Sequence, residues 1–432
     1  MIQIEIVFKG ESMDLKKYII EVVKKARNAS FEMARIDTAT KNKALLETAN
    51  ELEKRAQEII SQNAKDITNG VEKKLSSAMV DRLKIDEAMV KKIANVLREV
   101  ATLPDPVGEI TDMIVRPSGI KVGKMRVPIG VICIIYESRP NVTIDAASLC
   151  IKSGNAVILR GGSEAINSNI ILAKIMSEVC SGAGLPSDCV QIITTTDREA
   201  VKELLIQDKY IDLVIPRGGK SLIKTVVETS KVPVIKHYDG NCHLYVDKDA
   251  DLKKAEEIAI NAKTQRPGVC NAIETILVHQ DIADIYLRNL FSKLREKKVE
   301  IRGCERTLKI DSSVFSATED DWYTEYLDLI LAVKIVDNID EAIAHITKYG
   351  SNHTEAIVTE NYTSAMKFLR EVNSSCVMVN ASTRFSDGGE FGMGCEIGIS
   401  TDKLHARGPM GLKELTTQKF IVFGSGQIRT TK

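Results

Sequence analysis

Short apolar runs alternate with helix-like segments along most of this chain, and no other feature of the sequence constrains its fold as strongly. In the first series each run ends in a polar or glycine-rich turn, and the runs cover residues 156–162, 190–196, 212–219 and 232–236. Between the first two runs, residues 164–184 carry apolar side chains at helical spacing. Strands separated by helices predict a parallel sheet with helices on both faces, which is an α/β fold.

A second series of the same kind follows residue 243, so we expect two α/β domains. Its strand candidates are residues 243–247, 272–279, 329–337, 355–360 and 376–382. We place the border after residue 242, which gives a first domain of residues 1–116 and 129–242 and a second domain of residues 243–412. Residues 12–101 of the first domain read as helical, and Asp37 or Thr38 is expected to cap one of these helices.

Residues 117–128 and 413–432 fit neither domain. The first segment alternates like a hairpin with glycine turns, and the second contains an apolar strand candidate. A lone hairpin is marginally stable in water, and a bare strand edge invites pairing. Pairing with another subunit would explain both segments and predicts a homo-oligomer. The alternative is that both segments fold back on their own chain.

Composition narrows the classes of partner. The 59 basic and 59 acidic side chains cancel, so no net charge draws the molecule to nucleic acid or to an anionic membrane surface. No apolar segment approaches the roughly 18 residues of a membrane span. The nine cysteines are odd in number and include no C-x-x-C pair, which predicts reduced thiols and a cytoplasmic location. We therefore expect a small-molecule partner, with no nucleic acid and no membrane.

The histidines give no metal-binding pattern. None of the six histidines forms an H-x-x-x-H pair. His237 and His243 stand on either side of Cys242, but no further candidate ligands follow nearby. The sequence therefore predicts no metal site.

One cysteine, Cys270, stands on a turn after Arg-Pro-Gly-Val and just before an apolar run. The thiolate is the reactive form of cysteine, and a nearby cation such as Arg266 favours it. Cys270 is therefore a candidate nucleophile. The alternative is a packing cysteine that lies at a bend.

Two basic, glycine-rich turns stand where a strand candidate passes into a helix candidate. They consist of Arg160, Gly161, Gly162 and Ser163, and of Arg217, Gly218, Gly219, Lys220 and Ser221. Backbone N–H groups at a helix start favour phosphate, so the two turns predict a phosphate-rich cofactor. Arg160 beside the uncharged Ser163 suits a ribose 2′-phosphate. Ordinary strand-to-helix turns are the alternative.

Two further polar stretches are candidate walls of a site. Arg139 and Asn141 directly follow an apolar strand candidate. Residues 380–415 are rich in glycine and polar side chains, and Arg384, His405 and Arg407 in this stretch could contact anions. A capped strand-to-helix loop and a solvent loop are the alternatives.

Five strings carry a resemblance to a known family: IYESRPNVT, VILRGGSEA, IPRGGKSLI, RPGVCNAIET and EIGISTDKLHARGPMGL. In this order, they resemble the aldehyde dehydrogenase superfamily, and more closely its branch that reduces γ-glutamyl phosphate in proline biosynthesis. The resemblance implies a Rossmann-type, NADP-binding first domain and an α/β catalytic second domain. It also implies that residues 117–128 and 413–432 form a small β element for oligomerisation.

The resemblance implies roles for individual residues as well. Cys270 matches the nucleophile, which forms a thioester with the substrate. The turns at 160–163 and 218–221 match the contacts to the adenosine ribose and to the diphosphate, which implies NADPH (NADP⁺) as the cofactor. Without gaps, the position of the asparagine that helps form the family's oxyanion hole falls on Glu137, and Asn141 stands four residues further on. Asn271 beside the nucleophile is another neutral donor.

One departure from the family pattern bears on the reaction. Oxidising members carry a glutamate that activates water to hydrolyse the thioester, and here His237 stands in that position, 33 residues before Cys270. Without this base the thioester survives until hydride arrives. The resemblance therefore implies a phosphorylating, NADP-dependent dehydrogenase that forms glutamate-5-semialdehyde and phosphate. The alternative is a non-phosphorylating NAD(P)-dependent aldehyde dehydrogenase of the same fold.

The implied substrate, γ-glutamyl phosphate, carries a carboxylate, an ammonium and a phosphate group. The candidate contacts to its anionic groups are Arg139, His237, Ser382, Arg384, His405 and Arg407. A glutamate kinase, which would supply the unstable acyl phosphate, is a candidate partner.

Overall fold

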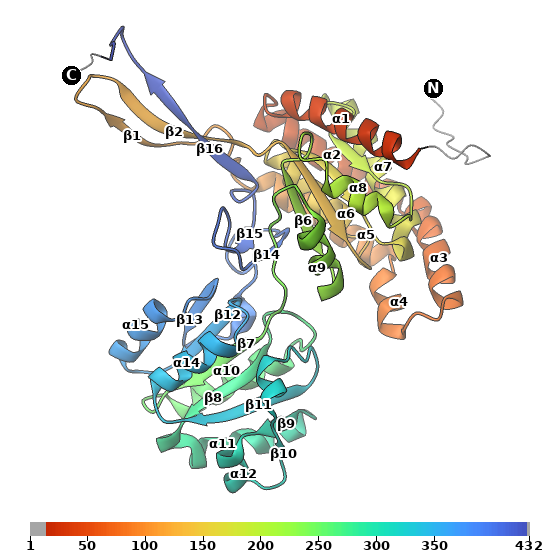
Figure 1. The fold of residues 1–432 in the computed structure, drawn as a ribbon. Coiled ribbons are helices and arrows are strands. Elements are labelled where there is room, and N and C mark those ends of the chain that lie inside the picture. The colour runs from red at the N-terminus through yellow and green to blue at the C-terminus, as the bar shows by residue number, and fades with distance from the viewer. Residues whose placement is uncertain (1–13, 430–432) are drawn as a thin grey trace. The chain divides into compact units, whose positions relative to one another are not determined.

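The computed structural model describes residues 14–429, except the side chain of Ala78, and the chain divides into two compact units. Unit 1 comprises residues 14–235, 394–397 and 411–429, and unit 2 comprises residues 236–393 and 398–410. Each unit contains a parallel sheet covered by helices, so the predicted α/β fold is confirmed (Figure 1). None of the helices formed by the described residues combines the length and the apolar character that a membrane crossing requires.

Unit 2 begins at Lys236, whereas the sequence placed the border after residue 242. Lys236 forms an ion pair of 2.7 Å with Asp402, and His237 Nδ1 lies 2.9 Å from the carbonyl oxygen of Ile399. These contacts attach residues 236–241, which precede the first strand of unit 2, to that unit. A border placed from strand patterns alone misses such contacts. The functional roles assigned to the domains remain predictions.

The core of unit 1 is a four-stranded parallel sheet with the strand order β5-β4-β3-β6. Its strands are β3 (Val131–Tyr136), β4 (Ala156–Arg160), β5 (Val190–Ile192) and β6 (Leu213–Arg217). All residues of β3 and β4 are buried, which explains why both are continuous apolar runs. The strand order reverses at β3. The topological switch point, where open α/β sheets bind ligands, therefore lies between the carboxyl ends of β3 and β6.

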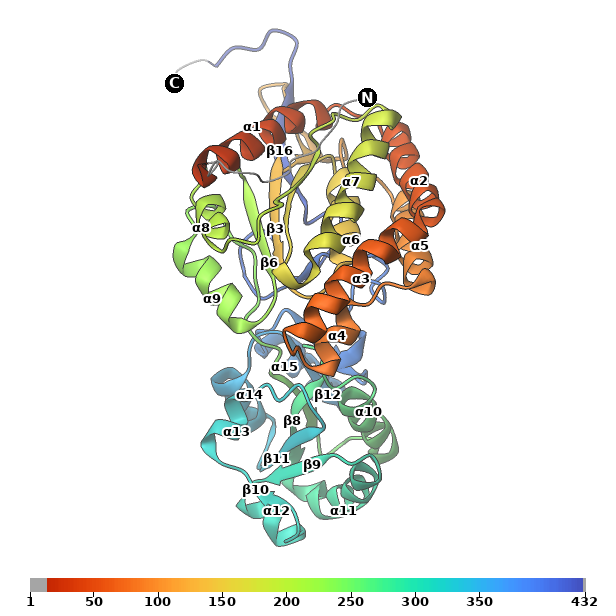
Figure 2. The same ribbon diagram turned by 90° about the vertical axis from the view of Figure 1, so that its right-hand side faces the viewer.

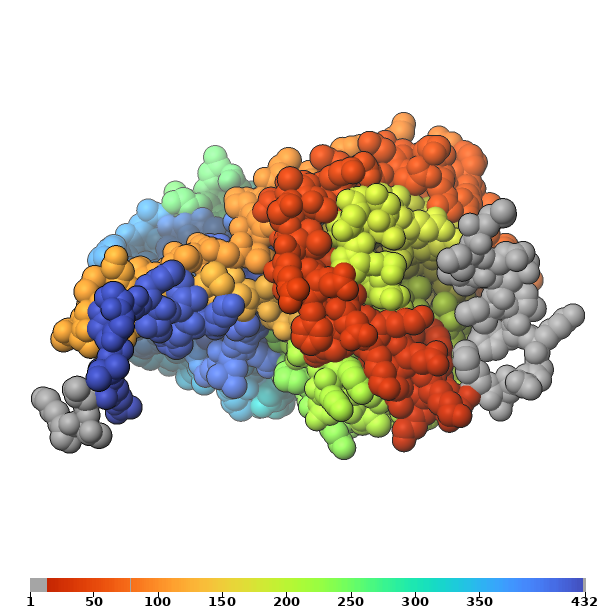
Figure 3. All heavy atoms as spheres, turned by 90° about the horizontal axis from the view of Figure 1, so that it is seen from above, coloured from red at the N-terminus to blue at the C-terminus, as the bar shows by residue number. Residues whose placement is uncertain are grey.

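Helices cover both faces of this sheet (Figure 2). They are α1 (Leu15–Met33), α2 (Thr38–Lys54), α3 (Ala56–Glu72), α4 (Ser77–Leu83), α5 (Glu87–Thr102), α6 (Val142–Lys152), α7 (Ile166–Ala183), α8 (Glu199–Leu205) and α9 (Lys220–Thr229). On one face α6 and α7 contact each other, and α2, α3 and α5 pack outside them, while α1 and α8 contact each other on the other face. In the space-filling view, the red atoms of α1 and α2 border the yellow-green atoms of α7 (Figure 3).

The start of α2 follows the predicted cap. Asp37 Oδ1 accepts a hydrogen bond of 2.7 Å from the backbone N–H of Thr40, which satisfies one of the free donors at the helix start. Within the region predicted as helical, the backbone of Arg55 leaves the helical conformation and separates α2 from α3.

A three-stranded antiparallel sheet with the order β1-β2-β16 extends from unit 1 (Figure 1). Its strands are β1 (Ile110–Val115), β2 (Lys121–Pro128) and β16 (Thr416–Phe423). The segment 117–128, predicted as a hairpin, supplies only the turn and β2, because the partner strand β1 precedes it. Gly119, at a φ of +88°, makes this turn. The tail strand β16 pairs with β2 of its own chain along its whole length.

The run 232–236, predicted as a strand, forms only an isolated bridge between Val214 and Val234. The backbone N–H of Val214 donates to the carbonyl oxygen of Pro233, and the N–H of Ile235 donates back to Val214. Pro233 has no N–H of its own, so the ladder cannot continue through it. The predicted strand is therefore wrong at this position.

Unit 2 is built on a seven-stranded sheet with the order β10-β9-β11-β8-β7-β12-β13, parallel at every pairing. Its strands are β7 (Cys242–Val246), β8 (Ile273–His279), β9 (Glu300–Gly303), β10 (Phe315–Ser316), β11 (Ile330–Val336), β12 (Thr354–Val358) and β13 (Cys376–Val379). The five runs of the second series correspond to β7, β8, β11, β12 and β13. A separate antiparallel ladder pairs β14 (Gly398–Ser400) with β15 (Gly408–Met410).

Two apolar clusters hold the helices of unit 2 to opposite faces of its sheet. The helices are α10 (Leu252–Thr264), α11 (Gln280–Glu296), α12 (Glu305–Ile310), α13 (Glu319–Tyr323), α14 (Ile339–Tyr349) and α15 (Tyr362–Glu371). Ile276 and Val278 of β8 belong to the cluster with α10 and α11, whereas Leu277 belongs to the cluster with α14 and α15. Successive side chains of a strand point to opposite faces, so a fully buried strand contributes side chains to both clusters.

His345 of α14 is buried in unit 2 among aromatic rings. Its ring centroid lies 5.4 Å from that of Trp322 and 4.4 Å from that of Tyr349. Neither ring nitrogen has a hydrogen-bond partner among the described residues. Burial, with a smaller contribution from His243, lowers the pKa of His345 to about 2, so the imidazole is neutral in the folded protein.

We predict that the variant His345→Leu makes unit 2 less sensitive to acid. The unfolded histidine titrates near the ordinary pKa of 6.5 and the folded one near 2, so between these values the unfolded state binds more protons. The free energy of unfolding should fall as the pH drops below 6.5, by up to about 1.4 kcal/mol per pH unit from this group. Urea unfolding near pH 7 and pH 5, followed by the fluorescence of Trp322, the only tryptophan, measures the difference. Equal pH sensitivity in both proteins would contradict the prediction.

Candidate active site

Three segments that precede neighbouring strands meet at one edge of the sheet of unit 2. The strands β8, β7 and β12 are adjacent and parallel, so their amino ends lie at the same edge. Cys270 stands shortly before β8, His237 shortly before β7 and His353 directly before β12. The strand order therefore brings together side chains that lie far apart in the sequence.

The backbones at Gly240 and Cys270 are in close contact. A Cβ atom at Gly240 would lie 1.9 Å from the carbonyl oxygen of Cys270 and 2.5 Å from its Cα, so a side chain cannot be accommodated there. The N–H of Gly240 donates to Glu325 (2.7 Å), and the Cys242 thiol donates to the carbonyl oxygen of Cys270 (3.1 Å). This contact holds the turn that carries the candidate nucleophile against the segment that carries His237.

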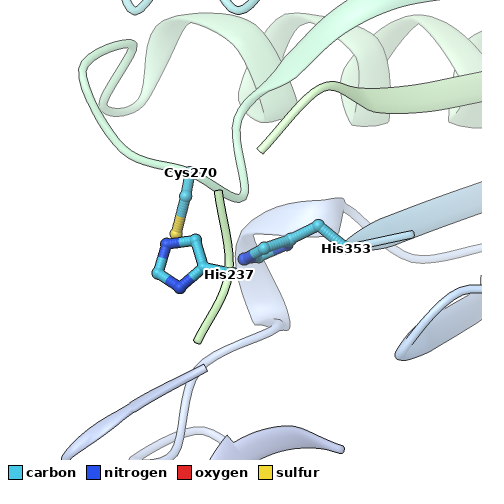
Figure 4. A group of neighbouring side chains, drawn as sticks. All are labelled: His237, Cys270 and His353. Atoms are coloured by element: carbon cyan, nitrogen blue, oxygen red, sulfur yellow. The ribbon is translucent and has the colours of Figure 1, made fainter. Parts of the chain in front are cut away.

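The side chains of His237, Cys270 and His353 point toward one another (Figure 4). One ring nitrogen of each histidine and the sulfur of Cys270 all lie within 4.8 Å of one another. Cys270 and His237 are half-buried, and His353 is buried. The group contains two imidazoles and no carboxylate.

His353 was not among the site residues predicted from the sequence. Its Nδ1 lies 2.9 Å from the hydroxyl of Thr354, which in turn donates a hydrogen bond of 2.9 Å to Ser386 Oγ. Because the Thr354 hydrogen is used in that bond, its oxygen accepts from the Nδ1–H group, and Nε2 carries the lone pair of the ring. A histidine directly before a strand was the available signal, but only the strand order shows that this strand starts beside Cys270.

A buried ion pair connects α10 and β8, the two elements on either side of the turn that carries Cys270. Lys263, near the end of α10, lies 2.5 Å from Glu274 in β8, and both side chains are fully buried. The second carboxylate oxygen of Glu274 accepts from the backbone N–H of Leu327 (3.1 Å). Burial raises the pKa of Glu274, and the Lys263 ammonium acts against that effect. The ion pair joins the two ends of the turn. Removing one partner would leave the other charge buried and unpaired, which would strongly destabilise the protein.

Asn271, predicted as an oxyanion donor, joins the turn that carries Cys270, the candidate nucleophile, to the loop after β13. Its Nδ2 donates to the carbonyl oxygen of Ser386 (2.9 Å), and its own carbonyl oxygen accepts from Thr383 Oγ1 (2.6 Å). Ser382 is buried, and its hydroxyl accepts from the N–H of Arg384 at the start of the 3₁₀ helix η2 (Thr383–Phe385). The loop of the predicted substrate contacts Ser382 and Arg384 therefore packs directly against the turn that carries Cys270.

Besides His237, Arg384 is a predicted anion contact that the structure brings near Cys270. Its Nε donates to Gln265 Oε1 (2.8 Å), on the turn that carries the thiol. Burial and the positive charge of Arg266 lower the pKa of Arg384, while Asp387 and Cys270 act in the opposite direction. Two guanidinium groups therefore accompany the thiol, which suits an anionic reactant.

His405 and Arg407 do not belong to the group around Cys270. Arg407 donates to the side chain and the carbonyl oxygen of Asn373, at 2.9 and 2.8 Å, just after α15. His405 is exposed and has a φ of +67°, in the left-handed region. Their predicted contact with the substrate receives no support from these positions.

Unit 1 carries the two basic turns at the carboxyl edge of its sheet. Arg160 ends β4, Gly161 and Gly162 follow it, and Ser163 begins the 3₁₀ helix η1 (Ser163–Ala165). Arg160 is only 8% exposed, and burial lowers its pKa. Its Nε has no hydrogen-bond partner among the described residues. A buried guanidinium with an unused donor fits an anionic ligand at this turn.

The second turn lies at the topological switch point. Arg217 ends β6, and Gly219 precedes α9 without a side-chain cap, so amide groups of the helix start are available to a phosphate. The N–H of Gly219 donates to Glu137 Oε2 (2.9 Å), and a Cβ at Gly218 would lie 2.4 Å from the same oxygen. Ser221 is exposed in the first turn of α9. The carboxylate of Glu137 thus occupies a position that suits an anion.

Asn141 and Arg139 lie in unit 1, in the loop between β3 and α6. The Nδ2 of Asn141 donates to Asp145 Oδ2 (2.7 Å), and burial raises the pKa of Asp145 to about 6. Arg139 is exposed. The predicted roles of Asn141 toward the oxyanion and of Arg139 toward the substrate remain predictions.

Two α/β units, each with a parallel sheet covered by helices, define a dehydrogenase of the aldehyde dehydrogenase fold. The sequence model of the aldehyde dehydrogenase family matches residues 12–327. The chain belongs to this family, as the sequence resemblance implied.

Relatives with similar sequences show to which branch of the aldehyde dehydrogenase family the chain belongs. The chain is 59% identical over 406 residues to a γ-glutamyl phosphate reductase of Caldanaerobacter subterraneus subsp. tengcongensis, which covers 94% of this chain and 98% of that protein. It is 57% identical to another of Geotalea daltonii, over 96% of this chain and 100% of that protein. The crystal structure of the γ-glutamyl phosphate reductase from Thermotoga maritima superposes with a TM-score of 0.94 at 48% identity, over 95% of this chain and 100% of that one. The chain falls in the γ-glutamyl phosphate reductase branch of the family.

We predict that Gly240→Ala destabilises unit 2, because the new methyl group would overlap the backbone of Cys270. Overpacking of this kind lowers the free energy of unfolding by about 1–3 kcal/mol. The matched control is Gly268→Ala on the turn that carries Cys270, where the nearest atom to the new Cβ is 3.6 Å away, so its effect should stay within about 0.5 kcal/mol. Urea unfolding followed by Trp322 fluorescence compares the two variants. Similar stabilities of both would refute the close contact.

Proposed function

We propose that the chain catalyses the NADPH-dependent reduction of γ-glutamyl phosphate to glutamate-5-semialdehyde and phosphate, a step of proline biosynthesis. The observation that carries the proposal is the half-buried thiol of Cys270, held beside His237 in a group that contains no carboxylate. The names of the relatives at 55–59% identity support the substrate.

In the proposed reaction the thiolate of Cys270 attacks the acyl carbon of γ-glutamyl phosphate. The bond between that carbon and the phosphate oxygen breaks, phosphate leaves, and a thioester forms. The backbone N–H of Cys270 would stabilise the oxyanion of the tetrahedral intermediate, with Asn141 and Asn271 as further proposed donors. Asn271 also acts as a positioning residue, because its amide ties the nucleophile turn to Ser386.

In this proposal the thioester has no glutamate base beside it, because His237 stands in that position. A carboxylate in its place would activate water and release the free acid. His237 Nδ1 lies 2.9 Å from the carbonyl oxygen of Ile399, and that carbonyl can only accept. The ring therefore presents Nε2 to the thiol side, where it is also suited to bind the leaving phosphate once protonated.

The cofactor site is proposed in unit 1. Arg160 and Ser163 would hold the adenosine ribose and its 2′-phosphate, and the unused Nε of Arg160 fits this role. Gly161 and Gly162 allow the backbone to approach the cofactor, while the turn of Arg217, Gly218, Gly219 and Ser221 would hold the diphosphate. Bound NADPH supplies the hydride that converts the thioester to the aldehyde and frees the sulfur.

Substrate recognition is proposed for the loop that packs on the nucleophile turn. Arg384 and Ser382 are best placed to bind an anionic group of the substrate, because this loop is hydrogen-bonded to Asn271. Arg139, His405 and Arg407 remain candidates by residue type. A glutamate kinase remains the proposed partner that supplies the acyl phosphate.

We also propose a homo-oligomer built through the three-stranded sheet. The outer strand β1 exposes Ile110, Ile114 and Val115, and β16 exposes Phe420 and Phe423. An exposed apolar sheet with open edges favours association with another copy. All nine cysteines are free, which supports a reducing compartment, the cytoplasm.

We predict that Cys270→Ala abolishes NADPH oxidation, by at least about 10³-fold, because no thioester can form. Binding of NADPH should be unchanged, since the proposed cofactor contacts lie in unit 1. The control Cys304→Ser changes another half-buried cysteine outside the group and should keep full turnover. A stopped-flow assay with γ-glutamyl phosphate measures turnover, and fluorescence titration measures NADPH binding. Turnover of the Cys270 variant would disprove the covalent route.

The reverse reaction separates the proposal from a non-phosphorylating aldehyde dehydrogenase. With glutamate-5-semialdehyde and NADP⁺, NADPH should form only when inorganic phosphate is present, because phosphate must attack the thioester. NADPH formation at the same rate without phosphate would identify the hydrolytic reaction instead.

We predict that Arg160→Ala raises the KM for NADPH by about 10–100-fold, because hydrogen bonds to charged groups contribute about 1.5–3 kcal/mol. The KM for NADH, which lacks the 2′-phosphate, should change much less. Lys202→Ala, an exposed lysine of α8 paired with Glu199, is the matched control and should alter neither value. Equal losses for both cofactors would place Arg160 outside the 2′-phosphate site.

A further inference from the structure

We infer that His237, Cys270 and His353 form a binding site for a divalent transition-metal ion of the zinc class, which captures the reactive sulfur and stops turnover. The inhibition part of this inference rests on the proposed function, because it takes Cys270 as the nucleophile. The metal-binding part rests on the geometry of the three side chains alone.

The donor set suits zinc. Two imidazole nitrogens and one thiolate are ligands that Zn²⁺ accepts, and three protein ligands leave a fourth position for water. Zinc bonds to nitrogen and sulfur are about 2.0–2.3 Å long, so tetrahedral ligand atoms stand roughly 3.3–3.7 Å apart. The three donor atoms lie within 4.8 Å of one another, which is close to these separations.

Hydrogen bonds already orient both imidazoles as metal ligands usually are. A ligating histidine commonly donates its other ring N–H to a carbonyl or a similar acceptor, which fixes the tautomer and raises the basicity of the ligating nitrogen. His237 directs Nδ1 to the carbonyl oxygen of Ile399, and His353 directs Nδ1 to Thr354 Oγ1, both at 2.9 Å. In each ring this leaves Nε2 with the lone pair that a metal requires.

The three ligands come from rigid surroundings. His353 is fully buried directly before β12, and the contact of Gly240 with Cys270 fixes the other two segments to each other. Sites held by packing and by hydrogen bonds outside the ligand shell lose little entropy when the metal binds. The guanidinium groups of Arg266 and Arg384 oppose a cation, so we expect weaker binding than at a four-cysteine structural site.

Binding involves no oxidation or reduction. The thiol of Cys270 loses its proton to solvent as the sulfur–metal bond forms, and the imidazoles bind in their neutral form. While the sulfur is bound to the metal, its lone pair is not available to attack an acyl carbon. Removal of the metal by a chelator returns the thiol and the activity.

The test uses Co²⁺ as the spectroscopic probe and the full-length protein, reduced with a phosphine that does not chelate metals. We expect a thiolate-to-cobalt charge-transfer band that saturates at one ion per chain and is displaced by Zn²⁺. The band should be absent in Cys270→Ala. In His237→Gln and His353→Gln the dissociation constant should rise at least about tenfold, since even partners outside the ligand shell cost about 10–100-fold.

Controls separate this site from other thiols and imidazoles. Cys304→Ser and His279→Gln remove a cysteine and a histidine of unit 2 outside the group and should leave the band unchanged. His353 is buried, so circular dichroism must show that its variant folds, and the half-buried His237 provides a second variant if it does not. No band in the wild-type protein, or a band that persists in both histidine variants, would overturn the metal site.

Activity is measured separately with Zn²⁺. Inhibition of NADPH oxidation should follow the occupancy measured with the probe and should be reversed by EDTA. If the cobalt band is absent but Cys270→Ala is inactive, the proposed function stands and the metal site fails. If the band behaves as expected but Cys270→Ala remains active, the metal site stands and the proposed function fails.

Discussion

The close approach of the Gly240 backbone to Cys270 is the constraint on which the rest of the candidate site depends. With a side chain at Gly240, the turn that carries Cys270 could not lie against the segment that carries His237. The buried pair of Lys263 and Glu274 fixes the base of the same turn. The thiol is therefore placed by backbone contacts and buried charges rather than by its own packing.

The two units use opposite edges of their parallel sheets. In unit 1, the basic turns follow β4 and β6 at the carboxyl edge, where helix starts offer N–H groups to anions. In unit 2, the cysteine and both histidines precede β8, β7 and β12 at the amino edge. Each edge thus supplies what its proposed task needs: amides and guanidinium groups for a phosphate-rich cofactor, and a thiol with imidazoles for acyl transfer.

Much of the fold could be predicted because parallel, doubly covered sheets leave a clear pattern in the sequence. Buried strands such as β3 and β8 are continuous apolar runs, and Asp37 caps a helix through a local hydrogen bond. Two strand predictions were wrong, one because of a proline inside the run itself and one because the pairing involves distant residues. Residues 232–236 look like a strand, yet Pro233 stops the ladder, and the alternation of 117–128 pairs with β1 and the tail instead of with itself.

The sequence by itself determined the α/β class, the two basic turns and the cysteine on its turn, because each depends on neighbouring residues and on local backbone preferences. The other predictions about chemistry came from the family resemblance, including the position of His237 in place of a glutamate. Only the tertiary structure decided that His353 joins Cys270, and that Arg407 is committed to Asn373. Those outcomes depend on strand order and on contacts across the fold, which no local pattern of residues encodes.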